Sequence, residues 1–77
     1  MRIKVYSTNS CPWCVRVKEW LNEHNIKFEE INVERDQKAA QEMIIRSGQE
    51  GVPVIDVDGE IIIGFDINKL KKLLKIE

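Results

Sequence analysis

Both cysteines of the chain stand in one tetrapeptide, Cys-Pro-Trp-Cys at positions 11–14, close to the N-terminus. The segment before it, residues 2–6, alternates polar and apolar residues, which is typical of a half-buried strand. The segment after it, residues 12–24, carries apolar residues at helical spacing. The cysteine pair therefore stands where a strand passes into the N-terminus of a helix. A CxxC pair in this context is typical of redox chemistry, whereas one in a loop or ribbon is more typical of a metal site.

The middle of the chain continues the alternation of strands and helices. Its β-branched residues predict a strand over residues 27–33. Asp36 can cap a helix that runs to about Ser47, and Gly48 supplies a C-terminal stop. The residues of this helix that we expect to face inward are Ala39, Ala40, Met43 and Ile44.

A hairpin and a last helix complete the pattern. Segments 53–57 and 60–63 have strand composition, and Asp58-Gly59 between them is a two-residue hairpin signal. Asp66 can then cap a helix whose apolar positions are Leu70, Leu73, Leu74 and Ile76.

The resulting element order, βαβαββα, predicts an α/β fold. The first two strands are joined through a helix, so they should be parallel with a right-handed crossover. The last two should form an antiparallel hairpin. We therefore expect one domain over residues 1–77, built on a four-stranded mixed sheet with helices on both faces.

Composition narrows the classes of function. The net charge of −1 argues against a general nucleic-acid binder, because neutralising phosphates needs a basic excess. No run approaches the roughly 20 apolar residues of a membrane span. Arg2 and Lys4 interrupt any apolar core of a signal peptide. We expect a cytoplasmic monomer without membrane or nucleic-acid partners. Thiols are mostly reduced in the cytoplasm, so a cysteine pair there is more typical of catalysis or metal binding than of a structural bridge.

Proline predicts different roles for the two cysteines. Pro12 keeps Cys11 out of the helical conformation and is itself favoured at the first helical position, so Cys11 should be the N-cap. Its sulfur would then face the free amides of Trp13 and Cys14 and the positive end of the helix dipole, which stabilise a thiolate. Such surroundings can lower a thiol pKa from about 8.5 to roughly 3.5–7.5.

Cys14 should behave differently, because it shares an apolar stripe with Val17 and Leu21. We expect it to be less exposed, with a higher pKa. Cys11 is thus predicted to attack a substrate disulfide, and Cys14 to resolve the mixed disulfide by attacking Cys11.

Two other classes of function remain open at this point. A tetrahedral zinc site needs four ligands, and the chain offers two cysteines and His24. His24 lies roughly 20 Å along the helix from Cys11 at about 1.5 Å per residue, so it can serve neither as ligand nor as base. The metal alternative is therefore a homodimeric iron–sulfur carrier bridged through Cys11. The other class is a non-catalytic binding module, which an unreactive Cys11 would favour.

Neighbouring side chains have two interpretations each. Trp13 either forms an apolar platform for substrate beside Cys11 or packs on the N-terminal loop. Arg16 either supports an anionic ligand or is a solvated helix residue. Trp20 is expected in the core.

These residues resemble the glutaredoxins and the wider thioredoxin-fold family over essentially the whole chain. The matching motifs are Val5-Tyr6-Ser7, the Cys-Pro-Trp-Cys segment, Arg46-Ser47-Gly48, Val52-Pro53 and Gly64-Phe65-Asp66. The resemblance implies a thioredoxin fold and a thiol–disulfide oxidoreductase that acts on disulfide-containing proteins or glutathione mixed disulfides. It implies no bound cofactor, and glutathione or thioredoxin reductase as the source of electrons.

The resemblance also assigns a binding surface. It implies that Val52-Pro53 is a cis peptide against the cysteines, with the Val52 backbone offered to substrate as in an added strand. A plain strand start is the other interpretation of this proline. The residues implied in substrate binding are Pro12, Trp13, Arg16, Val52, Pro53, Gly64, Phe65 and Asp66. Asp66 can also be simply an N-cap, worth about 1 kcal/mol.

The chain departs from glutathione-using glutaredoxins at three places. They usually carry a lysine shortly before the first cysteine, where this chain has Thr8 and Asn9. Their Gly-Gly-x-Asp-Asp segment is Ile-Gly-Phe-Asp-Ile over 63–67, and their Thr-Val-Pro begins with Gly51. The Gly-Phe pair is closer to the glutaredoxin-like hydrogen donors of ribonucleotide reductase, although the Arg-Pro that follows in that group is absent. We therefore expect glutathione to bind less firmly here.

Overall fold

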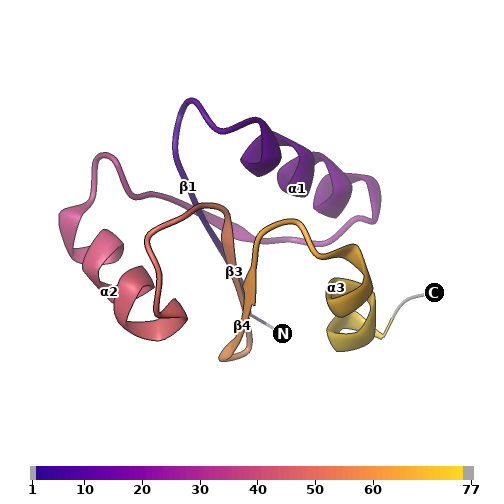
Figure 1. Ribbon diagram of the computed structural model, residues 1–77. Helices are drawn as coiled ribbons and strands as arrows, with labels where there is room; N and C mark the ends of the chain where they lie inside the picture. The colour runs from indigo at the N-terminus through magenta and orange to yellow at the C-terminus, as the bar shows by residue number, and fades with distance from the viewer. Residues whose placement is uncertain (1, 76–77) are drawn as a thin grey trace.

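The computed structural model describes residues 2–75, which form four strands and three helices in the predicted order (Figure 1). The elements are β1 (Ile3–Ser7), α1 (Pro12–Glu23), β2 (Glu29–Asn32), α2 (Gln37–Ser47), β3 (Val54–Val57), β4 (Glu60–Ile63) and α3 (Ile67–Leu74). The strands lie in the order β2-β1-β3-β4. β1 is parallel to β2, whereas β3 is antiparallel to both β1 and β4. The predicted four-stranded mixed sheet is confirmed.

Helices cover both faces of this sheet, as predicted. α1 and α3 lie on one side and α2 on the other (Figure 1). Side chains alternate between the two layers along β3: Ile55 packs with Leu21 and Leu70, while Val54 packs with Met43. Both faces of β3 are buried. Three of its four residues are apolar, and the fourth, Asp56, forms an ion pair with Arg46.

Local signals at the element ends are confirmed. The Asp36 carboxylate accepts a hydrogen bond from the Ala39 amide at 3.0 Å, and Gly48 ends α2 in the left-handed region with φ 74°. Asp58 and Gly59 both have positive φ, which a two-residue hairpin of this kind requires. α3 begins after Asp66, the expected cap.

Some boundaries and one inward residue were predicted wrongly. The first strand, predicted over residues 2–6, extends to Ser7, which is buried. The strands predicted over 27–33 and 53–57 are shorter at their ends.

Ile44 was predicted to face inward, but it is exposed. α2 turns Ala39 and Met43 toward the sheet, four residues apart, and Ile44 lies about 100° further around the helix. Ile76, predicted as an apolar position of α3, lies outside the described residues.

One buried carboxylate ties α2 to the hairpin. Asp56, on β3, is 6% exposed and forms an ion pair with Arg46 of α2. Its other oxygen accepts a hydrogen bond from the Gly59 amide at 2.7 Å. Both oxygens of this buried group are therefore satisfied, as a buried charge requires.

We expect Asp56→Ala to destabilise the fold by about 2 kcal/mol, because the Arg46 guanidinium and the Gly59 amide would lose their acceptor. Glu42→Ala is the matched control, since Glu42 also lies near Arg46, at 3.9 Å, but is exposed. The control should change the free energy of unfolding by less than about 0.5 kcal/mol. Urea denaturation of both variants measures the difference, and equal effects would contradict this account.

Candidate active site

The register of the sheet brings three loops to one edge. Tyr6 of β1 pairs with Val54 of β3, and Val54 pairs with Ile63 of β4. The end of β1, the start of β3 and the end of β4 therefore lie side by side. The loops that continue from these strand ends carry the Cys-Pro-Trp-Cys segment, the Val-Pro pair and the Gly-Phe-Asp segment. Motifs that are far apart in the sequence thus meet in one place.

Cys11 is the N-cap of α1, as predicted. Its backbone is extended, with φ −102° and ψ 109°, and Pro12 is the first helical residue. The amide of Cys14 donates a hydrogen bond to the Cys11 sulfur at 3.2 Å. The sulfur also lies 3.7 Å from the backbone oxygen of Val52, and the residue is partly exposed. This arrangement presents one sulfur to solvent at the positive end of a helix dipole.

Cys14 is fully buried on the stripe that it shares with Val17 and Leu21. Burial, followed by a hydrogen bond to the Cys11 sulfur, raises the pKa of Cys14 to about 11. A backbone hydrogen bond from Thr8 and the charge of Lys18 act in the opposite direction. The expected contrast between a surface sulfur and a buried, protonated one is thus present in the structure.

The Val52–Pro53 peptide is cis and lies against Cys11. Pro53 is buried, and its carbonyl accepts a hydrogen bond from the Gly64 amide at 2.9 Å. This bond joins the loop before β3 to the loop after β4. The cis peptide that the resemblance implied is confirmed, and β3 begins at the next residue, Val54.

An aromatic cluster borders the cysteines. Trp13 is 54% exposed, and its ring centroid lies 6.2 Å from that of Phe65. The guanidinium carbon of Arg16 stands 5.1 Å from the Trp13 centroid, within the range of a cation–π interaction. Trp13 is therefore an open surface rather than part of the packed loop, and the charge of Arg16 is directed to it.

Three other residues considered in the sequence analysis have roles in the fold or lie away from the cysteines. The Asp66 carboxylate accepts a hydrogen bond from the Lys69 amide at 3.1 Å, so its capping role is confirmed. Trp20 was expected in the core but is only half-buried, with one side packed on the core and the other open. His24 lies at the opposite end of α1, where its ring stacks on Trp20 at 4.1 Å.

A polar network beside Cys14 was not foreseen from the sequence. Lys18, one turn after Cys14, forms an ion pair with Glu30 of β2. The Ser7 hydroxyl donates to the same carboxylate oxygen at 3.2 Å. The hydrogen bond from Lys18 lowers the pKa of Glu30. The sequence shows that Cys14 and Lys18 lie one helical turn apart. It does not show that Glu30, on a separate strand, is the ion-pair partner of Lys18.

The comparisons with known proteins agree with this geometry. The model of the glutaredoxin family matches residues 3–62. The chain belongs to the glutaredoxin family. It is 49% identical over 73 residues to a glutaredoxin-like 8.6 kDa protein in the rubredoxin operon of Clostridium pasteurianum, covering 95% of this chain and 97% of that protein.

Solved structures of the same family type superpose closely on this glutaredoxin. A variant of the thioredoxin-like protein BC3987 has a TM-score of 0.92 and 39% identity, covering 99% of this chain and 97% of that one. The glutaredoxin-like NrdH-redoxin from Escherichia coli has a TM-score of 0.85 and 30% identity, covering 95% of each chain. The fold is thus the thioredoxin fold, and the protein is a thiol–disulfide oxidoreductase, as glutaredoxins are. The family takes its electrons from glutathione or from thioredoxin-type reductants.

Two further observations concern the described part of this glutaredoxin. Over residues 2–75, no three side chains of His, Cys, Asp or Glu gather in a way that could hold a metal ion. Within the same residues, none of the helices has the length and apolar character needed to cross a membrane.

We expect a limiting amount of iodoacetamide at pH 7 to label Cys11 before Cys14, because the thiolate is the reactive form and Cys14 is buried and protonated. The labelling rate of Cys14 should keep rising as the pH approaches its pKa of about 11, since the thiolate fraction grows with pH. Peptide mapping by mass spectrometry across a pH series measures both rates. Preferential labelling of Cys14 at neutral pH would reverse the assignment.

Proposed function

We propose that the protein reduces disulfides by a dithiol mechanism in which Cys11 attacks and Cys14 resolves. The observation that carries this proposal is the contrast between the two sulfurs: Cys11 is accessible at the helix N-terminus, whereas Cys14 is buried and protonated next to it. A sulfur at a helix N-terminus is open to a substrate disulfide and lies at the positive end of the helix dipole. A buried neighbour is protected from side reactions until the first step has occurred.

The cycle balances in two exchanges. The Cys11 thiolate attacks one sulfur of the substrate disulfide, so a mixed disulfide forms and the other substrate sulfur leaves as a thiolate that takes up a proton. Cys14 then loses its proton and attacks the Cys11 sulfur, which releases the second substrate thiol. The substrate has gained two electrons and two protons, and the protein holds a Cys11–Cys14 disulfide. A dithiol or two thiols must return the two electrons.

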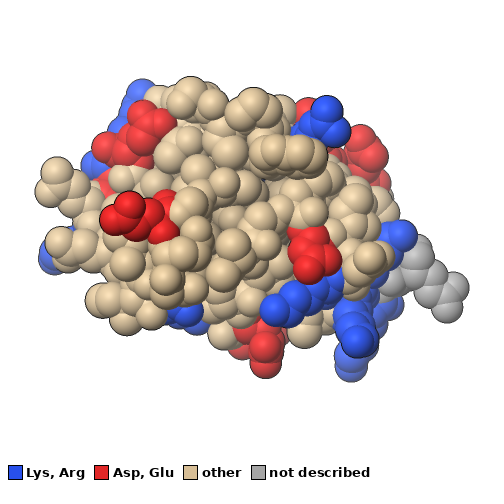
Figure 2. Space-filling view, viewed as in Figure 1, with Lys and Arg blue, Asp and Glu red and all other residues tan. Residues whose placement is uncertain are grey.

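The substrate would pair with the backbone of Val52. The loop before β3 places this backbone beside the Cys11 sulfur, and an extended segment around the substrate disulfide can hydrogen-bond to it as an added strand. Its surroundings suit a protein substrate, because Trp13 is exposed. Figure 2 shows uncharged residues across much of the middle of one face of the molecule, with acidic side chains to the left and right of it.

We expect Cys11→Ser to abolish disulfide reduction, since no nucleophile would remain at the helix N-terminus. Cys14→Ser should instead trap mixed disulfides with protein substrates, because the resolving thiol is missing, while a monothiol reaction with glutathione persists. Non-reducing electrophoresis with a protein disulfide substrate measures the trapped species. An active Cys11→Ser protein would contradict the mechanism. A coloured homodimer with a visible charge-transfer band, lost in Cys11→Ser, would favour an iron–sulfur carrier instead.

We propose that the electrons come from a thioredoxin-reductase-type system rather than from glutathione. The position of the usual lysine is occupied by Thr8 and Asn9, and Ile67 stands where glutathione-using relatives have a second acid. The remaining acid, Asp66, is engaged in capping α3. The Escherichia coli NrdH-redoxin has a thioredoxin-like activity profile, which supports the same choice.

Restoring the missing charges should improve the use of glutathione. A charge-assisted hydrogen bond contributes about 1.5–3 kcal/mol, so the double variant Thr8→Lys, Ile67→Asp should need roughly ten- to a hundredfold less glutathione for half-maximal rate. The rate of disulfide reduction against glutathione concentration measures this, with thioredoxin reductase as a parallel electron source. Low-micromolar saturation in the native protein, or no gain in the variant, would contradict the assignment of these positions.

A further inference from the structure

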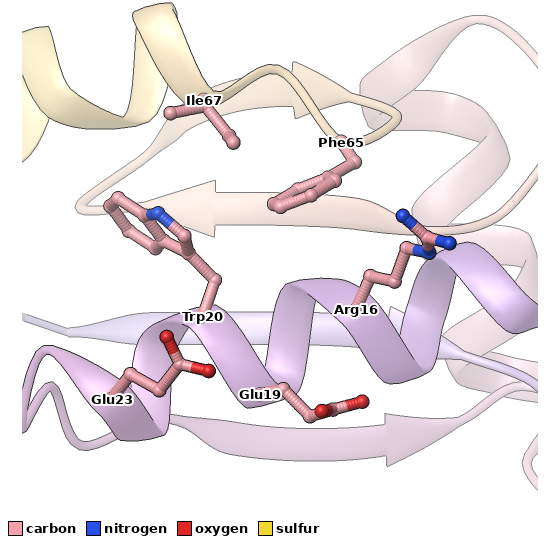
Figure 3. A pocket seen from close by; sticks show the side chains of 6 residues that line it. All are labelled: Arg16, Glu19, Trp20, Glu23, Phe65 and Ile67. Carbon is pink, nitrogen blue, oxygen red and sulfur yellow. The ribbon is translucent and has the colours of Figure 1, made fainter.

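A groove of about 480 Å³ runs along α1 beside the cysteine loop (Figure 3). Its lining comes from two parts of the chain, α1 and the segment that leads into α3. The lining residues are Arg16, Glu19, Trp20 and Glu23 on α1, with Phe65 and Ile67 on the other side. The dithiol chemistry described above uses neither Trp20 nor the two glutamates.

The groove has aromatic walls and an acidic rim. In Figure 3 the rings of Trp20 and Phe65 stand on either side of the space between α1 and the opposite segment, with Ile67 above. Trp20 is held in place, because it packs on the core and stacks on His24 at 4.1 Å. A site with fixed walls loses little side-chain freedom when a ligand enters.

The charges of the groove are separated. The Arg16 guanidinium lies over Trp13 at 5.1 Å, at the end of the groove next to the cysteines. Glu19 and Glu23 lie further along α1, both exposed, and neither forms an ion pair with any residue of 2–75. Beside Trp20 the groove thus combines one aromatic ring with the carboxylate of Glu23, and the carboxylate of Glu19 lies on the same helix, nearer to Arg16.

We propose that this groove binds a basic side chain, arginine or lysine, of a protein whose disulfide is reduced at Cys11. Aromatic faces attract a cation through the ring quadrupole, and the aliphatic stem of such a side chain packs on the same rings while the carboxylates pair with its head. The inference rests on the proposed dithiol function, because it places the partner's disulfide at Cys11.

Geometry sets the spacing between the basic residue and the partner's cysteine. Trp20 is nine helical positions beyond Cys11, or roughly 14 Å along α1 at about 1.5 Å per residue. An extended chain covers this distance in about four residues at roughly 3.3 Å each. The partner is therefore expected to carry arginine or lysine about four residues from its reactive cysteine.

The kinetic test uses peptides with one disulfide that differ only at the fourth residue from the cysteine, which is Arg, Ala or Glu. We expect the Arg peptide to have a KM about tenfold below that of the Ala peptide, with similar kcat, and the advantage to shrink at high salt. Glu19→Gln with Glu23→Gln should remove most of the advantage. Glu29→Gln with Glu60→Gln is the matched control, because it makes the same charge change on exposed residues of β2 and β4 and should leave the advantage intact.

A binding measurement separates this proposal from the proposed function. The Arg and Ala peptides are made with serine in place of cysteine, and the indole N–H signal of Trp20 is followed by NMR. A shift of this signal with the Arg peptide alone supports the groove proposal. Failure of the native protein to reduce bis(2-hydroxyethyl) disulfide would refute the proposed function, but it would leave this support for the groove unchanged. Equal shifts with both peptides, no shift with either, or equal loss of the Arg advantage in the control variant would overturn the groove proposal.

Discussion

The start of α1 at Pro12 is the local event on which the site depends. Proline disfavours the helical conformation at the residue before it, so Cys11 stays extended and its sulfur turns back toward the first-turn amides. The same event places Cys14 on the buried side of the helix, where it meets the core stripe. Two thiols that are close neighbours in sequence thereby acquire opposite surroundings. A helix beginning one residue earlier would give both sulfurs helical positions and remove the cap.

The sheet supplies what the helix alone cannot. β3 is buried on both faces, and its pairing with β1 and β4 leaves no freedom in where the loops at its start emerge. The Val52 carbonyl is consequently held beside Cys11, and the Pro53 carbonyl is joined to Gly64. Asp56 also joins this strand to α2 through its ion pair with Arg46. Core packing and site geometry are thus consequences of one set of strand registers.

Local features were predictable from the sequence, and features that depend on packing between distant elements were not. The caps at Cys11 and Asp36 and the Asp58-Gly59 hairpin follow from a few neighbouring residues, and all are confirmed. The exposure of Ile44 was missed because helical spacing does not say how wide a stripe the sheet covers. The open side of Trp20 depends on how closely α3 approaches α1, which no periodicity reveals. The cis form of the Val-Pro peptide came from family resemblance alone.

The high pKa of Cys14 is compatible with a resolving role because part of its cause disappears during the proposed cycle. Burial raises this pKa first, and the hydrogen bond to the Cys11 sulfur and its charge add to the effect. Once Cys11 is joined to substrate, its sulfur carries no negative charge, so the contributions of Cys11 to the raised pKa of Cys14 weaken. The opposing influences of Thr8 and Lys18 remain in place. Formation of the mixed disulfide thus eases the deprotonation of Cys14, which links the second exchange to the completion of the first.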